Sequence, residues 1–222
     1  MFTVITSQFT RPLKKITKEE AIHLITTENP FISGDYHLLK ETNKKHSDRH
    51  FEQYYKQTQN NIQMHNRCVG ENDLWLCVGD ISESELHKAE DIAALYNMIK
   101  SLHGRKILII GNNDNFDDEF YYKCGFEYVS RSYIATPQYI FSHEPQNMAE
   151  LKVSSDVLNL HGHLHGAGSY RNMDWKQHID VFHGKHDGSV LQFSQYLDNY
   201  RNGMYRDYYS TYATFATDNV RV

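Results

Sequence analysis

Short apolar runs divide this chain, and a polar block follows each of them. The blocks supply carboxylate, imidazole and amide side chains, and they are Asp35-Tyr36-His37, Gly79-Asp80, Gly111-Asn112-Asn113-Asp114, His143 and Gly162-His163-Leu164-His165. Continuous apolar runs of roughly four to eight residues are typical of buried strands. In layered α/β folds, binding sites collect beyond the carboxyl ends of the strands. The order of runs and blocks therefore predicts an α/β fold in which the blocks converge on one site.

The remaining pattern agrees with alternating strands and helices. Thr17-Lys18-Glu19-Glu20 predicts a capping box that begins a helix through Ile25, and Pro30 ends it. After the second block, apolar residues recur with the period of an α-helix. Strands are expected at 30–34, 74–78, 106–110, 139–141 and 157–160, and further helices at 47–65 and 82–102.

Length and composition favour one domain. The 222 residues, 40% of them hydrophobic, are enough for one core. We expect an N-terminal extension over 1–29, a catalytic core over 30–195 and a Tyr-rich tail over 196–222. No apolar stretch is long enough to span a membrane, so no membrane association is expected. Three scattered cysteines without a C-x-x-C pair, and a start unlike a signal peptide, predict a cytoplasmic protein.

Charge limits the partners. The net charge is −5 and no run of five Lys or Arg occurs, which argues against general affinity for nucleic acid through a basic surface. Two bound divalent cations would nevertheless make the site itself positive. The expected substrate is therefore a small anionic molecule, and a nuclease remains an alternative.

The blocks have the chemistry of a two-metal site. Asp35 and His37 are two residues apart, so on an extended segment both side chains point to the same side. His163 and His165 repeat this spacing. A carboxylate such as Asp80 can bridge two cations, and two metals about 3.5–4 Å apart can clamp a phosphoryl group. Oxygen and imidazole ligands without thiolate suit Mn, Fe, Ni, Co or Zn.

The ordered set resembles the calcineurin-like metallophosphoesterase superfamily, whose pattern is D-x-H, G-D, G-N-H-[DE], H and G-H-x-H. The resemblance covers residues 30 to about 190 and extends to the neighbours of the blocks, as in Phe141-Ser142-His143-Glu144-Pro145 and His161-Gly162-His163-Leu164-His165-Gly166. It implies a sandwich of two mixed β-sheets flanked by helices. It also implies metal-assisted hydrolysis of a phosphoester, with phosphodiesters, nucleotides or related monoesters as substrates.

The resemblance also assigns ligands. Asp35, His37, Asp80 and His165 would hold a first metal. Asp80 would bridge to a second metal, which Asn112, His143 and His163 would complete. The expected activity is that of a dinuclear-metal-dependent phosphodiesterase.

Two departures from the family pattern raise questions about catalysis. Asn113 stands where the family has a catalytic His, and an amide cannot act as a general acid. Some family members carry Cys there and still hydrolyse phosphodiesters. Asn113 is thus a candidate catalytic residue, with an ordinary turn residue as the alternative. Lys40 replaces the second His of a D-x-H-F-G-H subgroup and is a candidate phosphate contact or a solvated side chain.

Other readings remain open. His161 is a candidate substrate contact or a packed core histidine. The motif set could also fall by coincidence on another α/β protein, or mark a catalytically impaired metal-binding or interaction module on the same fold. The tail has six tyrosines between residues 196 and 212, which favours edge packing or a contact between copies in a homo-oligomer. A base-stacking platform normally also contains Lys and Arg.

Overall fold

The computed structural model describes residues 14–39, 48–82, 86–165, 175–182 and 189–204, without the side chains of residues 48–55. The helices are α1 (Lys18–Thr27), α2 (Asp48–Cys68), α3 (Ala89–Ser101), α4 (Asp118–Lys123) and α5 (Phe193–Arg201), with a short 3₁₀ turn at Trp175–Gln177. The strands are β1 (Phe31–Ser33), β2 (Leu74–Cys77), β3 (Arg105–Ile109), β4 (Phe126–Ser130), β5 (Ile134–Ala135), β6 (Tyr139–Ser142), β7 (Leu158–His161), β8 (His178–Asp180) and β9 (Leu191–Gln192).

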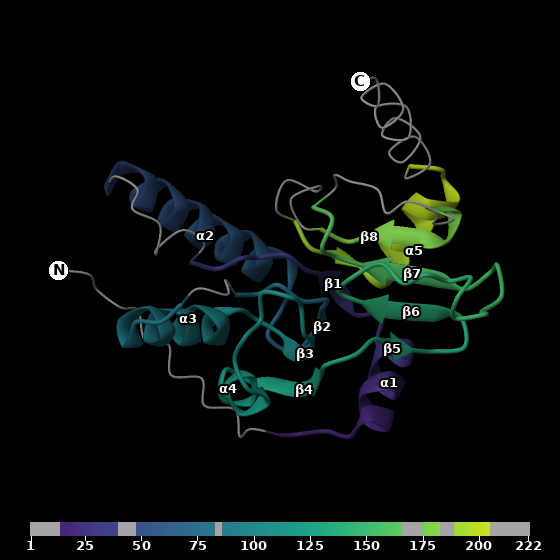
Figure 1. Cartoon of the computed structure of the whole chain (residues 1–222), viewed down its shortest axis with the longest axis horizontal. Coiled ribbons are helices and arrows are strands. Elements are labelled where there is room, and N and C mark those ends of the chain that lie inside the picture. The colour runs from purple at the N-terminus through teal and green to yellow at the C-terminus, as the bar shows by residue number, and fades with distance from the viewer. Residues whose placement is uncertain (1–13, 40–47, 83–85, 166–174, 183–188, 205–222) are drawn as a thin grey trace, which may run out of the picture.

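These strands form two mixed sheets (Figure 1). The first has the order β4-β3-β2-β1-β9, with neighbours parallel except for β9, which is antiparallel to β1. The second has the order β5-β6-β7-β8, with only β5 antiparallel to its neighbour. The fold class expected from the sequence is confirmed.

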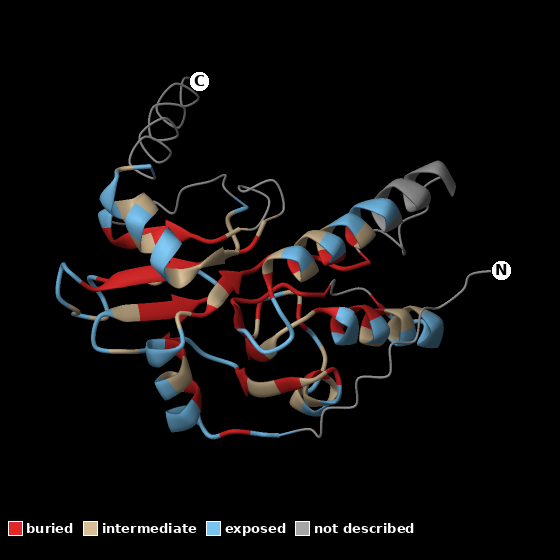
Figure 2. Ribbon diagram, turned by 180° about the vertical axis from the view of Figure 1, so that it is seen from behind, coloured by how far each residue is buried: buried red, intermediate tan, exposed pale blue. Residues whose placement is uncertain are grey.

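Strand β2 explains the layering. All four of its residues are buried, and successive side chains point to opposite faces of the sheet. Trp75 and Cys77 join the core cluster that contains apolar side chains of α2, α3 and α4. Leu74 and Leu76 join the cluster that contains side chains of the second sheet. The strands at the centre of the molecule are coloured mainly as buried in Figure 2. A parallel strand covered on both faces needs a continuous apolar run, which the sequence provides.

Helix α1 begins as expected. The Thr17 hydroxyl accepts a hydrogen bond from the backbone of Glu20, whose side chain accepts one from Thr17. The expected start of α3 at Ser82 is wrong, because α3 begins at Ala89. The Ser82 backbone N–H and hydroxyl both donate to Asp114. Ser82 also pairs with Leu38 in an isolated bridge instead of beginning a helix.

Helix α5 adds a contact that spans both sheets. The Tyr196 side chain is fully buried, and its hydroxyl donates to the carbonyl of Ile32 at 3.2 Å and lies 3.5 Å from that of Val181. The boundary that the sequence suggested at residue 195 thus falls inside α5, while residues 205–222 of the tail lie outside the described part. Within the described residues, no helix is both long and apolar enough to cross a membrane.

Each polar block follows a strand, with at most one residue between them. Strands β1, β2 and β3 lead into the first three blocks, and β6 and β7 lead into the last two. Because β1–β3 are parallel to one another, as are β6 and β7, their carboxyl ends lie on one edge of each sheet. The candidate site is built at these ends.

Candidate metal centre

The backbone of the ligand blocks is unusual. Among the described non-glycine residues with positive φ are five of the seven candidate ligands: Asp35 (59°), His37 (43°), Asp80 (51°), His163 (68°) and His165 (50°). A non-glycine residue in the left-handed region costs on the order of 1–3 kcal/mol and persists only where its surroundings hold it there. Such strain concentrated in one cluster is typical of functional sites.

Hydrogen bonds between the blocks hold these conformations. The N–H of Asp35 donates to the carbonyl of Gly79, and that of His37 donates to the carbonyl of Asp80, both at 2.9 Å. Glycines allow the close approach, since a Cβ on Gly162 would lie 2.5 Å from Asp35 Oδ2. A Cβ on Gly111 would collide with the Asp80 carboxylate. The glycines in the motifs are therefore needed for packing against the carboxylates.

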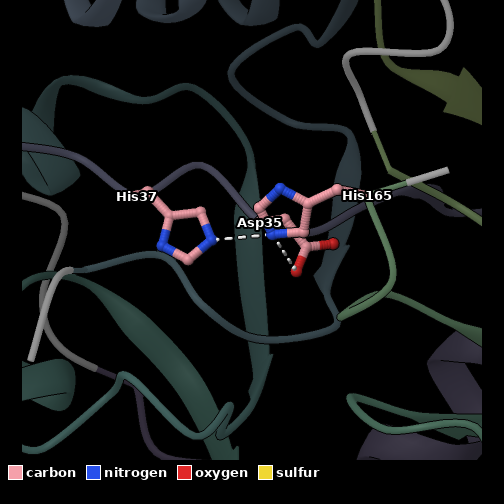
Figure 3. A group of neighbouring side chains, drawn as sticks. All are labelled: Asp35, His37 and His165. Atoms are coloured by element: carbon pink, nitrogen blue, oxygen red, sulfur yellow. Dashed lines mark hydrogen bonds and ion pairs between the residues drawn. The ribbon is translucent and has the colours of Figure 1, made fainter. Parts of the chain in front are cut away.

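The first ligand group consists of Asp35, His37 and His165 (Figure 3). The Nε2 atoms of His37 and His165 lie 2.9 Å apart, and His165 Nε2 lies 3.6 Å from Asp35 Oδ1. The imidazole of His165 also stacks on Phe182, with ring centroids 4.8 Å apart. Two imidazole nitrogens and a carboxylate oxygen thus point at one small volume.

The second ligand group consists of Asp80, His143 and His163, with Asn112 beside it. His143 Nδ1 donates to the carbonyl of Val78 at 3.0 Å, and burial lowers the pKa of His143, which favours the neutral form. A neutral imidazole with one N–H committed in this way presents a lone pair at Nε2. That atom lies 2.8 Å from Asn112 Oδ1 and 3.1 Å from His163 Nδ1.

Asp80 lies between the two groups. Its Oδ2 is 3.6 Å from His37 Nε2, and its Oδ1 is 3.5 Å from His143 Nε2. The carboxylate, only 2% exposed, therefore directs one oxygen toward each group. A second link is the backbone N–H of His163, which donates to the Asp35 carboxylate at 2.9 and 3.1 Å.

The electrostatics suit a cation. Burial raises the pKa of Asp35 well above its usual range, although the N–H of His163 opposes this, and the nearby carboxylates of Asp180, Asp80 and Asp114 raise it further. Buried carboxylates and neutral imidazole lone pairs that face one another repel unless a positive charge lies among them. The donor set of oxygen and imidazole nitrogen fits divalent transition metals.

The other site candidates are placed differently. His161 is fully buried, with Nδ1 donating to the carbonyl of Gly162, and its ring packs against His178. Burial lowers the pKa of His178 to about 3, so that this ring stays neutral. Asn113 is half-buried and lies against Asp80. Lys40 lies outside the described residues. The roles of all three as substrate or catalytic residues stay predictions.

Sequence reasoning gave no role to Asp114, which lies in the third block and organises the site. Its Oδ2 accepts from the N–H groups of Asp80 and Gly111, and its Oδ1 accepts from Ser82. Burial raises the pKa of Asp114 to about 6, while the bonds from Gly111 and Ser82 lower it. The acidic position that ends the family's third motif was the available signal.

A buried hydrogen-bond chain beneath the first block was also missed. His65 Nε2 donates to the carbonyl of His103 at 3.0 Å, so in the neutral ring Nδ1 accepts from the Tyr36 hydroxyl at 2.8 Å. Trp75 Nε1 donates to Ser33 Oγ at 2.9 Å, which leaves the Ser33 hydroxyl to donate to the Tyr36 oxygen at 3.1 Å. Tyr36 thus anchors the loop between Asp35 and His37 to the core.

Two solved structures are similar to this chain, and the first of them supports this architecture. A solved protein of unknown function from Aquifex aeolicus, AQ665, matches with a TM-score of 0.51 and 18% identity, over 76% of this chain and 97% of that one. The nuclease MPE of Pseudomonas putida matches with a TM-score of 0.40 and 18% identity, over 62% of each chain. The search of curated proteins found no match. At these identities, the first likeness speaks for the fold alone.

The family comparison is more specific. The family model described as calcineurin-like phosphoesterase matches residues 31–217, which include all five blocks. It also includes both ligand groups and the strands that lead into them. The chain belongs to the calcineurin-like phosphoesterase family.

Proposed function

We propose that this protein is a phosphodiesterase that depends on two divalent metal ions. The family generally consists of metal-dependent phosphoesterases, and the structure holds two candidate ligand groups. The observation that carries the proposal is Asp80, whose carboxylate directs one oxygen to His37 and the other to His143. A single-metal site has no need for a buried carboxylate shared in this way.

The proposed division of ligands follows the geometry. Asp35, His37, His165 and Asp80 Oδ2 would hold one ion. His143, His163, Asn112 and Asp80 Oδ1 would hold the other. Two such ions supply a hydroxide nucleophile at neutral pH and stabilise the charge that develops on the phosphoryl oxygens. Mn, Fe, Ni, Co and Zn all suit these donors.

The protein's own groups orient the reaction. The Val78 carbonyl fixes the His143 tautomer, and the His163 N–H orients Asp35. Asn113 has no titrating group, so it cannot protonate a leaving oxygen. Loss of a general acid typically costs ~10²–10⁴-fold, and the loss falls mainly on poor leaving groups. The favoured substrate is therefore a small anionic phosphodiester whose leaving group is stable as an anion.

Metal content and substrate preference test the proposal together. Protein supplemented with Mn²⁺ or Ni²⁺ should contain two ions per chain by elemental analysis. It should hydrolyse bis(para-nitrophenyl) phosphate faster than the monoester para-nitrophenyl phosphate and faster than a dialkyl phosphate. One ion or none in the supplemented protein would overturn the two-metal assignment.

A catalytically impaired interaction module is the second candidate, and Asn113 is the observation that favours it. The substitution Asn113→His separates the two functions, since it restores a titrating group. It should raise turnover of alkyl phosphoesters more than that of nitrophenyl esters. Absence of hydrolysis by both forms with two ions bound would favour the interaction module. Cleavage of a DNA oligonucleotide in preference to small diesters would favour a nuclease instead.

A further inference from the structure

We infer that Asn113 is a positioning residue that fixes the orientation of the Asp80 carboxylate, with one oxygen toward each ligand group. The inference rests on the proposed two-metal function. The backbone N–H of Asn113 donates to Asp80 Oδ1 at 2.8 Å, and its side-chain Nδ2 donates to Asp80 Oδ2 at 2.7 Å. Asn113 thus donates a hydrogen bond to each oxygen of the shared carboxylate.

The rest of Asp80 is already fixed. Its N–H donates to Asp114 Oδ2 at 2.8 Å, and its carbonyl accepts from the N–H of His37 at 2.9 Å. The freedom that remains is rotation about the side-chain bonds, which would turn the carboxylate away from one group. The two bonds from Asn113 oppose this rotation. Each carboxylate oxygen keeps a second lone pair, so a bond from Asn113 still leaves it able to bind a cation.

The two bonds are not equivalent. The bond to Oδ1 comes from the main chain, so it is available whatever side chain occupies position 113. The bond to Oδ2 comes from the amide, and Oδ2 is the oxygen that faces His37 in the first ligand group. Loss of the amide should therefore release only the oxygen on the side of the first group.

This geometry also explains how Asn can replace His here. The Nδ1 atom of a histidine is attached to Cγ, as Nδ2 is in asparagine, so an imidazole N–H can reach the same oxygen. Histidine would hydrogen-bond to Asp80 and also provide an acid at Nε2. Asparagine provides only the hydrogen bond to Asp80. Because its amide N–H lies on Asp80, asparagine at this position orients a ligand and does not donate that proton to substrate.

Titration of Mn²⁺ into the metal-free full-length protein, followed by calorimetry and electron paramagnetic resonance, tests the inference. His37→Ala and His143→Ala identify the ion of the first and second group. Asn113→Ala should lower the affinity for the first-group ion, the one that His37→Ala identifies. The expected loss is roughly 10–100-fold, the usual cost of losing a group that orients a ligand. The affinity for the other ion should stay within about twofold of wild type. Asn113→His should bind both ions as the wild type does.

Two further variants complete the design. Asn113→Leu keeps the size of the side chain without a donor, and it should reproduce the Asn113→Ala result independently of any cavity. Asn147→Ala removes an amide-to-carboxylate bond of the same length, 2.7 Å to Glu150, between two residues that are not candidate ligands, and should leave the binding of both ions unchanged.

The outcomes are distinguishable. Unchanged, equally weakened or tighter binding of both ions in Asn113→Ala and Asn113→Leu would overturn the positioning role, while the two-metal function would stand. Fewer than two ions in the wild type would overturn both. A selective loss that Asn113→His restores would support both.

Discussion

The two ligand groups present similar donors, but the fold positions them by different means. All three residues of the first group, Asp35, His37 and His165, have positive φ, and the His165 side chain is 37% exposed. In the second group, His143 directly follows β6, is 5% exposed and is fixed through Nδ1 by the carbonyl of Val78. Asp80 and His163 of the second group also have positive φ, so the two groups differ mainly at His143. The second group has this ligand at the end of a strand, whereas all three ligands of the first group lie in left-handed loop positions.

This difference predicts unequal robustness. All three ligands of the first group, against two of three in the second, carry backbone strain of on the order of 1–3 kcal/mol each, which packing around the loop must offset. The Tyr36 anchor and the backbone bonds from Asp35 and His37 supply that packing. Substitutions below the loop should therefore affect the first ion selectively, and substitutions at the strand ends should affect the fold as well as the second ion.

The largest effect is expected where the two groups meet. Asp80→Ala should abolish binding of both ions, because each group loses an oxygen that faces it. Activity should fall by at least about 10²–10³-fold, the typical cost of one preorganised electrostatic group. Elemental analysis and hydrolysis of bis(para-nitrophenyl) phosphate measure both effects. Asp156→Ala, at an exposed carboxylate outside the ligand blocks, is the control. Retention of one ion at wild-type affinity would show that Asp80 serves a single group.

Local sequence pattern was sufficient for much of the fold. The strands that lead into the five blocks were predictable because each is a short apolar run, and α1 was predictable from its capping box. Strands β5 and β9 have only two residues each, and their pairing partners rather than their own pattern define them. The start of α3 was not predictable, because the bonds of Ser82 to Asp114 join segments separated by 32 residues.

The site divides in the same way. The identity and order of the candidate ligands could be taken from the motifs, because each motif is local. The left-handed backbone and the hydrogen bonds from Asn113 to Asp80 could not be predicted from the motifs, because both depend on contacts between different blocks. The sequence suggested that Asn113 is a catalytic residue or an ordinary turn residue, and its hydrogen bond to Asp80 is visible only in the structure.

The second prediction compares an exposed ligand with a buried one. His143→Ala should lower the free energy of unfolding by about 1–3 kcal/mol, since the buried Val78 carbonyl loses its donor. His165→Ala should change it by less than about 0.5 kcal/mol, because that side chain is partly exposed. Urea unfolding of the metal-free proteins measures both values. Mn²⁺ titration should show that each variant weakens a different ion. Equal losses of stability would contradict the contrast between the two groups.

The smallest effect tests the support beneath the first group. Tyr36→Phe removes the hydroxyl that donates to His65 Nδ1 and accepts from Ser33, while the ring and its contacts with Trp75 can remain. The free energy of unfolding should fall by about 1 kcal/mol. The affinity for the first ion should fall a few-fold, and the affinity for the second ion should not change.

Tyr96→Phe is the matched control, because it removes a hydroxyl that accepts only a surface hydrogen bond from Lys100 among those described. It should alter neither stability nor metal affinity. If Tyr36→Phe lowers stability without weakening the first ion, the buried chain supports the core alone. If it weakens both ions equally, the two groups share one support, and the distinction between a loop-held and a sheet-held half of the site fails.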